Sequence, residues 1–559
     1  MELSKVNQTL LGVFYIILTL SVTYIISSLF HENVFSTQLT MSSLISKSFF
    51  LLYCLMPLVA SFIPKSIIHA KLKQIFPFIV LVGLSLLIVS VFPSIPTSDN
   101  IGMSRASMDL FNGSPFDTVK YGLYPGYLIF YGLSGQSAGV DNFKLYPLLF
   151  CLVAILSLTF VYLASKLLIT SSPYIPTMMY LVSGSIFSYF ILEAAFLGLL
   201  LFSIGLYLVL KLYRVKYDEA YAILLILISA SIVITHFFAS FFWLSILLGI
   251  VIGGRYLKIA TNRRLFILIC LVSILFLIHH LYLGYFVFWS GVWNFNNIIA
   301  GSALVNGYNP PTYLGLEKTP FLQVISTINS ILRYCILASC LVTLVMWMKS
   351  DKRTQNRIGI ILTSMFGLGL GSLAMRIFAP SFSDRVFMYA YILFSLFGSY
   401  SVYTLLKTEK CHIITRFKMN QEKALSVLFI FILFGLFSHT YGTGVPVTST
   451  ELFSTKLLAD KGEGNSITCT VDEQEIFYYY ANKYPSESSQ VKNDRDPVEW
   501  GRAFSGQIET DYIILPDTLK QQYYTMRYGC DIPWSDITCS IEKFDRIYSN
   551  DKSHIFFIN

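Results

Sequence analysis

Long apolar runs recur along this sequence and restrict what it can fold into more than any other feature. From residue 9 to residue 441, stretches of about 17–25 apolar residues follow one another, and an α-helix needs that length to cross the hydrocarbon of a bilayer. Only 13% of the 559 residues are charged, whereas a soluble globular domain has about 25%. The sequence therefore predicts a mainly α-helical, polytopic membrane protein.

About thirteen membrane spans are predicted, and a different kind of sequence follows them. Glu193 and His236 divide long apolar blocks and set the limits of the middle spans. Residues 442–559 are polar and have no such run, so we expect a transmembrane domain at 1–441 and a soluble domain at 442–559. The predicted spans are 9–30, 48–63, 75–93, 142–168, 174–192, 196–210, 220–235, 237–252, 265–288, 322–347, 358–376, 385–406 and 424–441.

Short loops rich in Lys and Arg set the predicted orientation, because such loops stay in the cytoplasm. With thirteen spans and the N-terminus inside, all of these loops fall on the cytoplasmic side. The same rule accounts for the net charge of +8, so no nucleic-acid partner is expected. The other face is extracytoplasmic and receives the loop at 94–141 and the whole tail. The basic loops are 64–74, 211–219, 253–264, 349–357 and 407–423.

The first large external loop, at 94–141, begins with the acidic segment SDNIGMSRASMDLFNGSPFD. Within it, the spacing of Ile101, Met108 and Phe111 gives a helix one rough apolar face, and the turn residues at 113–115 end it. The next segment, YPGYLIFYGLSG, is too short to cross a membrane and is rich in Tyr, which predicts a second helix lying in the membrane interface.

Ionisable residues gather where this topology puts the outer face of the membrane. Such groups are costly in or near a bilayer and often mark functional sites, and several on one face are more informative than one. Ordinary roles stay open for each of them, because an aqueous loop tolerates acids, a lone His can be a packed core residue, and arginines can extend to the headgroups. The residues are Asp99, Arg105, Asp109, Asp117, Glu193, His236, His279, His280, Arg376, Asp384 and Arg385, with Tyr124 between the two loop helices.

This order of parts resembles the GT-C superfamily of lipid-linked-sugar glycosyltransferases, which includes protein O-mannosyltransferases, the aminoarabinose transferase of lipid A and oligosaccharyltransferase catalytic subunits. Their first external loop begins with an acidic motif, and a juxtamembrane helix, a PPL-like turn and a span follow. Here Asp99 occupies the acidic position, RASMDLFNGSPFD resembles the helix and its exit, YPGYLIFYGLSG resembles the proline-led segment, and FKLYPLLFCLVAILSLTFVYLASKLL resembles the span. ITHFFASFFWLSILL is similar to the His-containing span of archaeal members. The closing FDRIYSNDKSHIFFIN is similar to their closing strands, and this tail alone suggests an archaeal source.

Three departures from the family pattern limit what the resemblance implies, and one is that two extra predicted spans precede the span that leads into the loop. Asn100 follows Asp99 where many members have a second acid. The resemblance therefore permits a divalent metal, Mg²⁺ or Mn²⁺, without requiring one, and no cofactor is certain. The tail has no W-W-D-type motif, which argues against an oligosaccharyltransferase subunit.

The resemblance implies an inverting glycosyltransferase. A prokaryotic plasma membrane is the default expectation for its location, because no organelle signal is evident in the sequence. The enzyme would move a sugar from a polyprenyl- or dolichyl-phosphate donor to an extracytoplasmic protein, glycan or lipid acceptor. Asp99 would take the proton of the acceptor. Arg376, Arg385 or the nearer Arg105 would stabilise the leaving phosphate. The remaining candidates would contact phosphate or sugar, and these are Asp109, Asp117, Tyr124, His236, His280 and Asp384.

Three other functions are compatible with parts of the sequence. A transporter or flippase of lipid-linked glycans would have charged residues deep in mid-span and an internal repeat, whereas no repeat is evident and the polar groups gather on one face. A polysaccharide polymerase or ligase would be chemically close to the transferase. The protein could also be a non-catalytic scaffold with an external domain. In that case, unlike in the others, its function would not depend on Asp99.

The tail is expected to be a small α/β domain without a catalytic motif. SITCTVDEQEIFYYYANKY predicts a strand and a helix, TDYIILPDTLKQQYY a strand, a turn and a helix, and FDRIYSN with HIFFIN two strands. An oxidising exterior permits a disulfide. Cys530 and Cys539 are the first candidates because they are close in sequence, which would leave Cys469 free.

Overall fold

The computed structural model describes eleven helical segments and five short strands. Its helical part covers residues 98–113, 124–139, 142–169, 173–183, 194–214, 219–257, 263–282, 320–378 and 386–407. The predicted spans at 9–30, 48–63, 75–93 and 424–441 lie outside the described residues, so the count of thirteen spans stays a prediction. Five of the described helices (α9, α11, α14, α15 and α16) are long and apolar enough to cross a membrane.

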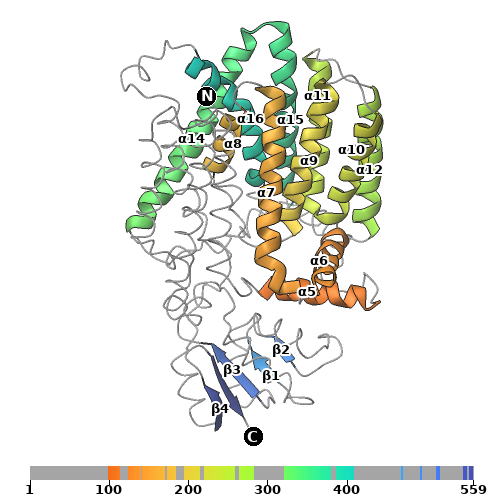
Figure 1. Cartoon of the computed structure of the whole chain (residues 1–559), viewed down its shortest axis with the longest axis vertical. Helices are drawn as coiled ribbons and strands as arrows, with labels where there is room; N and C mark the ends of the chain where they lie inside the picture. The colour runs from red at the N-terminus through yellow and green to blue at the C-terminus, as the bar shows by residue number, and fades with distance from the viewer. Residues whose placement is uncertain are drawn as a thin grey trace, which may run out of the picture.

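A bundle of long helices forms the body of the described part (Figure 1). Each lies where the sequence predicts a span, so the helical prediction is confirmed for this part of the chain. For α8 the described helix covers only the first half of the predicted span. The helices are α7 (Asn142–Leu168), α8 (Tyr174–Val182), α9 (Ala194–Arg214), α10 (Glu219–Thr235), α11 (Phe237–Tyr256), α12 (Arg263–Tyr282), α14 (Pro320–Met348), α15 (Lys352–Phe378) and α16 (Val386–Lys407).

The centre of the bundle is aromatic and closely packed. The rings of Phe202 on α9, Phe242 on α11 and Tyr389 on α16 meet with centroids 5.0 Å (Phe202–Tyr389) and 5.6 Å (Phe242–Tyr389) apart. The Tyr389 hydroxyl donates to the backbone carbonyl of Ala195 at 3.4 Å, which fixes the start of α16 beside the start of α9. These contacts join three helices that are far apart in sequence.

Two shorter helices, α5 (Ser98–Phe111) and α6 (Pro125–Ala138), lie at one end of the bundle (Figure 1). Pro125 stands in the first turn of α6, where its missing N–H costs nothing, and Gly139 ends the helix with a left-handed φ of 66°. The Ser107 hydroxyl of α5 donates to the Leu128 carbonyl of α6 at 2.8 Å. The two helices predicted in this loop are therefore present.

The two residues of the predicted apolar face of α5 whose side chains can be placed are exposed within the protein, which an interfacial helix allows. Met108 and Phe111 are exposed, at 38% and 36% of their surface, and the buried side instead includes Ala106 and Ser107. The reason is the close approach of α6, since Ser107 and the edge of the Phe111 ring fill the space beside Gly132 where a Cβ would stand. The side chain of Ile101 lies outside the described set.

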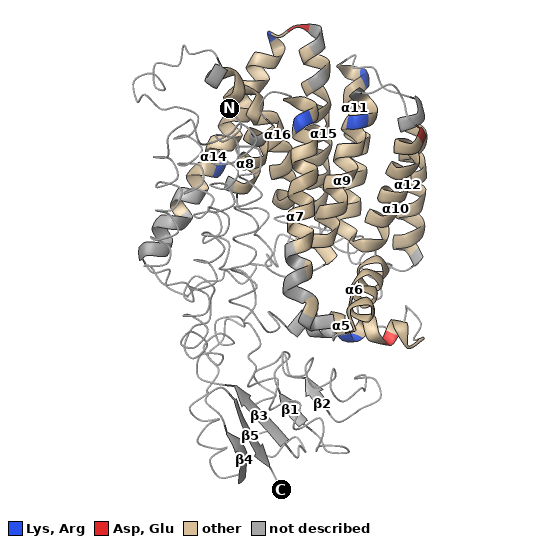
Figure 2. Ribbon diagram, in the orientation of Figure 1, with Lys and Arg blue, Asp and Glu red and all other residues tan. Residues whose placement is uncertain are grey.

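Charge is distributed unequally between the two ends of the bundle (Figure 2). Lys166 lies in the last turn of α7, Arg255 in the last turn of α11, and Lys349 precedes the single acid Asp351 in the turn between α14 and α15, all at the end away from α5 and α6. The positive-inside rule predicts such a separation. That the basic end faces the cytoplasm stays a prediction.

The tail contributes a five-stranded sheet with the order β2-β1-β3-β5-β4. Four of its strands were predicted, namely β1 (Ile467–Cys469), β3 (Tyr512–Pro516), β4 (Asp545–Ser549) and β5 (Ser553–Phe557), whereas β2 (Val491–Asn493) was not. β1 pairs in parallel with β2 and β3, and β5 pairs antiparallel with β3 and β4. The predicted helices of the tail, Cys530 and Cys539 lie outside the described residues, so an α/β domain stays a prediction.

Candidate functional site

The end of the bundle that carries α5 and α6 holds every predicted site residue whose position is described. Asp99 lies in the first turn of α5 and Arg376 near the end of α15, although the side chains of both lie outside the described set. Glu193, Asp117, Asp384 and Arg385 also lie outside it. The side chains that can be placed are those of Arg105, Asp109, Tyr124, His236, His279 and His280.

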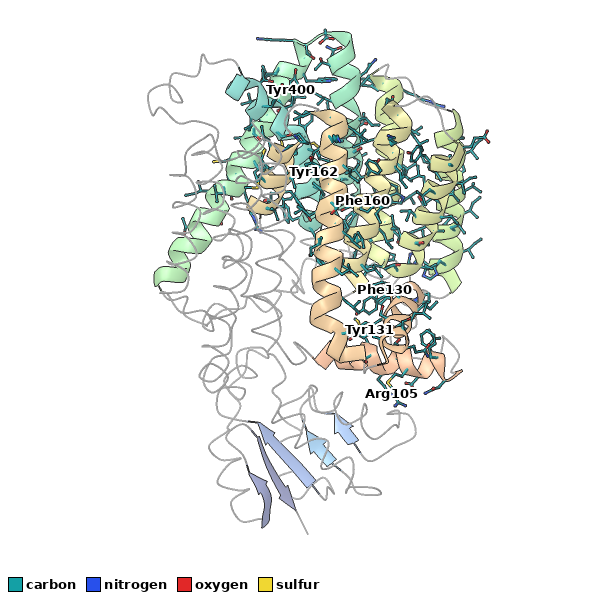
Figure 3. All side chains as sticks on the ribbon, in the orientation of Figure 1. Arg105, Phe130, Tyr131, Phe160, Tyr162 and Tyr400 are labelled. Atoms are coloured by element: carbon teal, nitrogen blue, oxygen red, sulfur yellow. The ribbon has the colours of Figure 1, made fainter. Side chains whose placement is uncertain are left out.

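Arg105 and Asp109 form a buried ion pair one turn apart on α5. The Nε of Arg105 donates to Oδ2 of Asp109 at 3.1 Å, and Nη2 lies 2.7 Å from Oδ1. Figure 3 shows Arg105 at the end of the helical bundle opposite Tyr400 of α16. Because both carboxylate oxygens accept from the guanidinium, Asp109 is not free to act as a base. The ion pair has no net charge, and a role for either residue in binding substrate stays a prediction.

His236 is the single residue between α10 and α11, which confirms the predicted division of this apolar block. Its backbone is extended, with φ −161° and ψ 129°, and its Nδ1 accepts from the backbone N–H of Ala239 at 3.3 Å. A side chain that accepts in this way caps the first turn of a helix. We infer that the neutral ring carries its proton on Nε2. The ring of Tyr124, just before α6, lies 5.4 Å from it.

His280 is fixed by a short hydrogen-bonded chain between α12 and the start of α11. Its Nε2 lies 3.2 Å from the hydroxyl of Ser240, and that hydroxyl lies 2.7 Å from the carbonyl of Phe237. A hydroxyl has one proton to donate. If Ser240 donates it to Phe237, then Ser240 must accept from the N–H of His280. The ring also packs against Phe237 and Phe276, at 4.8 and 4.4 Å between centroids.

Both histidines therefore have partners that hold helices together at this end. His236 joins α10 to α11, and His280 joins α12 to α11, while Tyr124 brings the start of α6 against His236. The end of the bundle is thus a connected polar and aromatic cluster. A role for these residues in contacting phosphate or sugar stays a prediction.

Sequence reasoning missed Arg333, which lies inside the predicted span 322–347. It is the only charged residue of the apolar stretch Ser330–Met348 of α14. Its Nε donates to the carbonyl of Ser183 at the end of α8 at 3.1 Å, and its guanidinium lies 5.4 Å from the centre of the Tyr391 ring. A single charge within an otherwise apolar run was the signal that could have identified it.

The described side chains do not form a metal site. Within the part of the chain that the structure describes, no three His, Cys, Asp or Glu residues are placed to hold a metal ion. The acidic candidates Asp99, Asp117 and Asp384 are not among the described side chains.

Comparisons with known proteins identify the fold. No family model matches the sequence, and no curated protein matches it. Among solved structures, the chain is similar to the archaeal oligosaccharyltransferase AglB from Archaeoglobus fulgidus, in complex with an inhibitory peptide and a dolichol-phosphate. The two chains are 11% identical, the match covers 85% of this chain and 73% of AglB, and the TM-score is 0.52.

Two further structures match over much of this chain. ArnT from Cupriavidus metallidurans, bound to undecaprenyl phosphate, is 10% identical over 87% of this chain and 97% of its own, with a TM-score of 0.45. The arabinofuranosyltransferase AftD from Mycobacteria is 12% identical over 88% of this chain and 42% of its own, with a TM-score of 0.48. The likeness to AglB shows a shared fold, and it confirms at that level the fold that the resemblance implies.

Proposed function

We propose that this protein is an integral-membrane glycosyltransferase that moves a sugar from a polyprenyl-phosphate donor to an acceptor at the outer membrane face. The observation that carries the proposal is the position of Asp99, in the first turn of α5, at one end of a bundle that shares the fold of AglB. AglB was solved with a dolichol-phosphate and a peptide, and a lipid phosphate and an external acceptor are the partners we propose here.

The proposed reaction is a single displacement with inversion. The acceptor oxygen attacks the anomeric carbon of the sugar, and the bond between that carbon and the phosphate oxygen breaks. Its electron pair stays on the leaving lipid phosphate. The carboxylate of Asp99 takes the acceptor proton as the new bond forms, which is general base catalysis. Arg376, near the end of α15, would stabilise the negative charge of the leaving phosphate, and Arg385 is a second candidate for this role from the sequence.

The neighbouring candidates have different roles in this proposal. Asp109 is neutralised by Arg105, so it would position α5 rather than accept a proton, and Asp99 is the base that we propose. The acceptor is a protein, a glycan or a lipid outside the cell. The C-terminal strands would belong to an extracytoplasmic domain of a plasma-membrane protein, and this orientation follows from the positive-inside rule.

Sugar transfer in membranes tests the proposal. Membranes with matched amounts of the parent, Asp99→Asn or Asp351→Asn would receive a panel of polyprenyl-phosphate sugars, and transferred sugar would be measured. Asp351→Asn is the control, since this exposed aspartate stands in the turn between α14 and α15, at the opposite end of the bundle. We expect Asp99→Asn to lower transfer at least ~100-fold, the range of a lost general base, and the control to match the parent.

The competing functions give different results. A transporter would move a labelled lipid-linked glycan across the vesicle membrane without transferring its sugar. Asp99→Asn would then lose no activity that the control variant keeps. If the parent transfers sugar and Asp99→Asn does so equally well, the enzyme assignment holds and Asp99 is not its base.

A further inference from the structure

The first turn of α6 lies directly against the end of α10. Gly126, the second residue of α6, has no side chain, and a Cβ there would lie 2.8 Å from the Thr235 hydroxyl oxygen and 2.9 Å from Cγ1 of Ile234. The backbone carbonyl carbon of Ile234 would be only 3.3 Å away. Just before α6, the Tyr124 ring packs against the ring of His236, with 5.4 Å between centroids. The start of α6 is therefore seated on the α10–α11 turn, which we define as Ile234 to His236.

The α10–α11 turn is itself held by three helices. The Thr235 hydroxyl donates to the Ser231 carbonyl of α10 at 2.6 Å, and the His236 ring accepts from the Ala239 N–H of α11. On the other side is Gly198 of α9, where a Cβ would lie 2.8 Å from Cβ of Ala239 and 3.5 Å from Cβ of His236. Thr235 and His236 are both buried. The turn thus gives α6 a closely packed support.

α6 in turn holds α5, and it lies between α5 and the α10–α11 turn (Figure 1). The Ser107 hydroxyl donates to the Leu128 carbonyl at 2.8 Å, and Ser107 and Phe111 fill the space beside Gly132. α5 is one unbroken helix, so Asp99 in its first turn lies about 12 Å along the axis from Ser107. A shift of α6 would therefore be passed on to the segment that carries Asp99.

We propose that the α10–α11 turn, acting through α6, sets the position of α5 and of Asp99. Gly126, Tyr124 and His236 are then positioning residues for sugar transfer. Their effect on the reaction rests on the proposed function, whereas the seating of α6 on the turn rests on the contacts alone. A residue that binds the donor changes KM, but one that positions the base changes kcat. The two roles of His236 and Tyr124 can therefore be told apart.

The test compares the parent with Gly126→Ala in purified full-length protein. Gly367→Ala is the matched control, because a Cβ on Gly367 of α15 would meet the Ser245 carbonyl of α11, which is a similar clash between two other helices. Sugar transfer from the polyprenyl-phosphate sugar on which the parent is most active gives kcat and KM. Hydrogen–deuterium exchange followed by mass spectrometry reports how firmly each helix is held, and it does not depend on activity.

We expect Gly126→Ala to lower kcat about tenfold or more, since a displacement of about 1 Å at a catalytic group can cost about 100-fold. KM for the lipid donor should stay within about twofold of the parent, because the base acts only in the transition state. Exchange should rise in α5 and α6. In Gly367→Ala exchange should rise in α11 and α15 instead, with kcat within about twofold of the parent.

His236→Asn is a second variant, which keeps the test decisive if Gly126→Ala does not fold. The Asn side chain can still cap α11, but the ring against which Tyr124 packs is lost. We expect kcat to fall about threefold with KM unchanged. A raised KM with unchanged kcat would assign His236 to donor binding and overturn the proposal.

Other outcomes also decide the matter. A kcat in Gly126→Ala equal to that of the parent, or an equal loss in Gly367→Ala, would mean that the seating of α6 does not position the base. If the parent transfers no sugar, the proposed function fails, and exchange alone decides the seating: a rise confined to α5 and α6 in Gly126→Ala supports it, and unchanged exchange refutes it. Sugar transfer by the parent with unchanged kcat and exchange in Gly126→Ala leaves the transferase standing and defeats this inference.

Discussion

The α5 end of the bundle and the seam between α11 and α15 are both closely packed, but different interactions hold them. At the α5 end, an ion pair, two histidines and hydroxyl groups each have a particular partner atom. In the seam, Gly249 and Gly367 let two backbones approach so closely that a Cβ on Gly249 would lie 2.5 Å from the Gly367 Cα. Small residues allow such approach in membrane helices. The first region depends on matched polar groups, and the second on the absence of side chains.

Breaking the ion pair should have the largest effect. Arg105→Gln leaves the buried Asp109 carboxylate without its cation, and loss of one partner of a buried pair costs about 3–5 kcal/mol. The double variant Arg105→Gln with Asp109→Asn has no uncompensated charge and should recover most of that loss. Thermal unfolding of the three proteins in detergent gives the comparison. Additive losses in the double variant would show that the pair is not coupled.

Adding one methyl group to the seam should have an intermediate effect. In Gly367→Ala the new Cβ meets the Ser245 backbone carbonyl, which cannot move aside as a side chain does, so we expect about 1–3 kcal/mol of destabilisation. Gly369, two residues along α15, has nothing within 4 Å of its Cβ position, and Gly369→Ala should be neutral or stabilising by about 0.5–1 kcal/mol. Equal unfolding temperatures for the two variants would mean that the seam packs more loosely than these contacts imply.

The smallest expected effect comes from one hydroxyl at the α5 end. Ser240→Ala removes the partner of the buried His280 Nε2 and should cost about 1 kcal/mol. Ser231→Ala is the control, because its exposed hydroxyl donates only to the Leu227 carbonyl within α10. Chemical denaturation of both variants measures the difference. If Ser231→Ala loses as much stability as Ser240→Ala, the hydrogen bond to His280 does not stabilise this end of the bundle.

The helices were predictable because their causes are local. Apolar runs of sufficient length define the spans, His236 marks the break between α10 and α11, and Pro125 marks the start of α6. The pairing partners were not predictable. Arg333 contacts the carbonyl of a residue 150 positions away, and nothing in the surrounding sequence indicates that α8 ends there.

The candidate site was predictable in its location but not in its connections. Sequence spacing put Arg105 and Asp109 one turn apart, yet whether they face each other or a ligand depends on the packing of α6 on α5. The same applies to Gly367 and Gly369, which are equivalent in the local pattern GLGLG. Only the position of α11 decides that an added Cβ clashes at Gly367 and is tolerated at Gly369.

The one-residue connection between α10 and α11 also has a consequence for biosynthesis. α10 has 17 residues and α11 has 20, and His236 alone separates them. If both helices cross the bilayer as the sequence predicts, we expect neither to settle there before the other, because a connection of one residue has no slack. The two would then insert together as a helical hairpin with His236 leading, and an imidazole is less costly to carry across than a lysine or an arginine side chain. On this prediction the turn suits the route by which the chain enters the membrane as well as the fold it reaches.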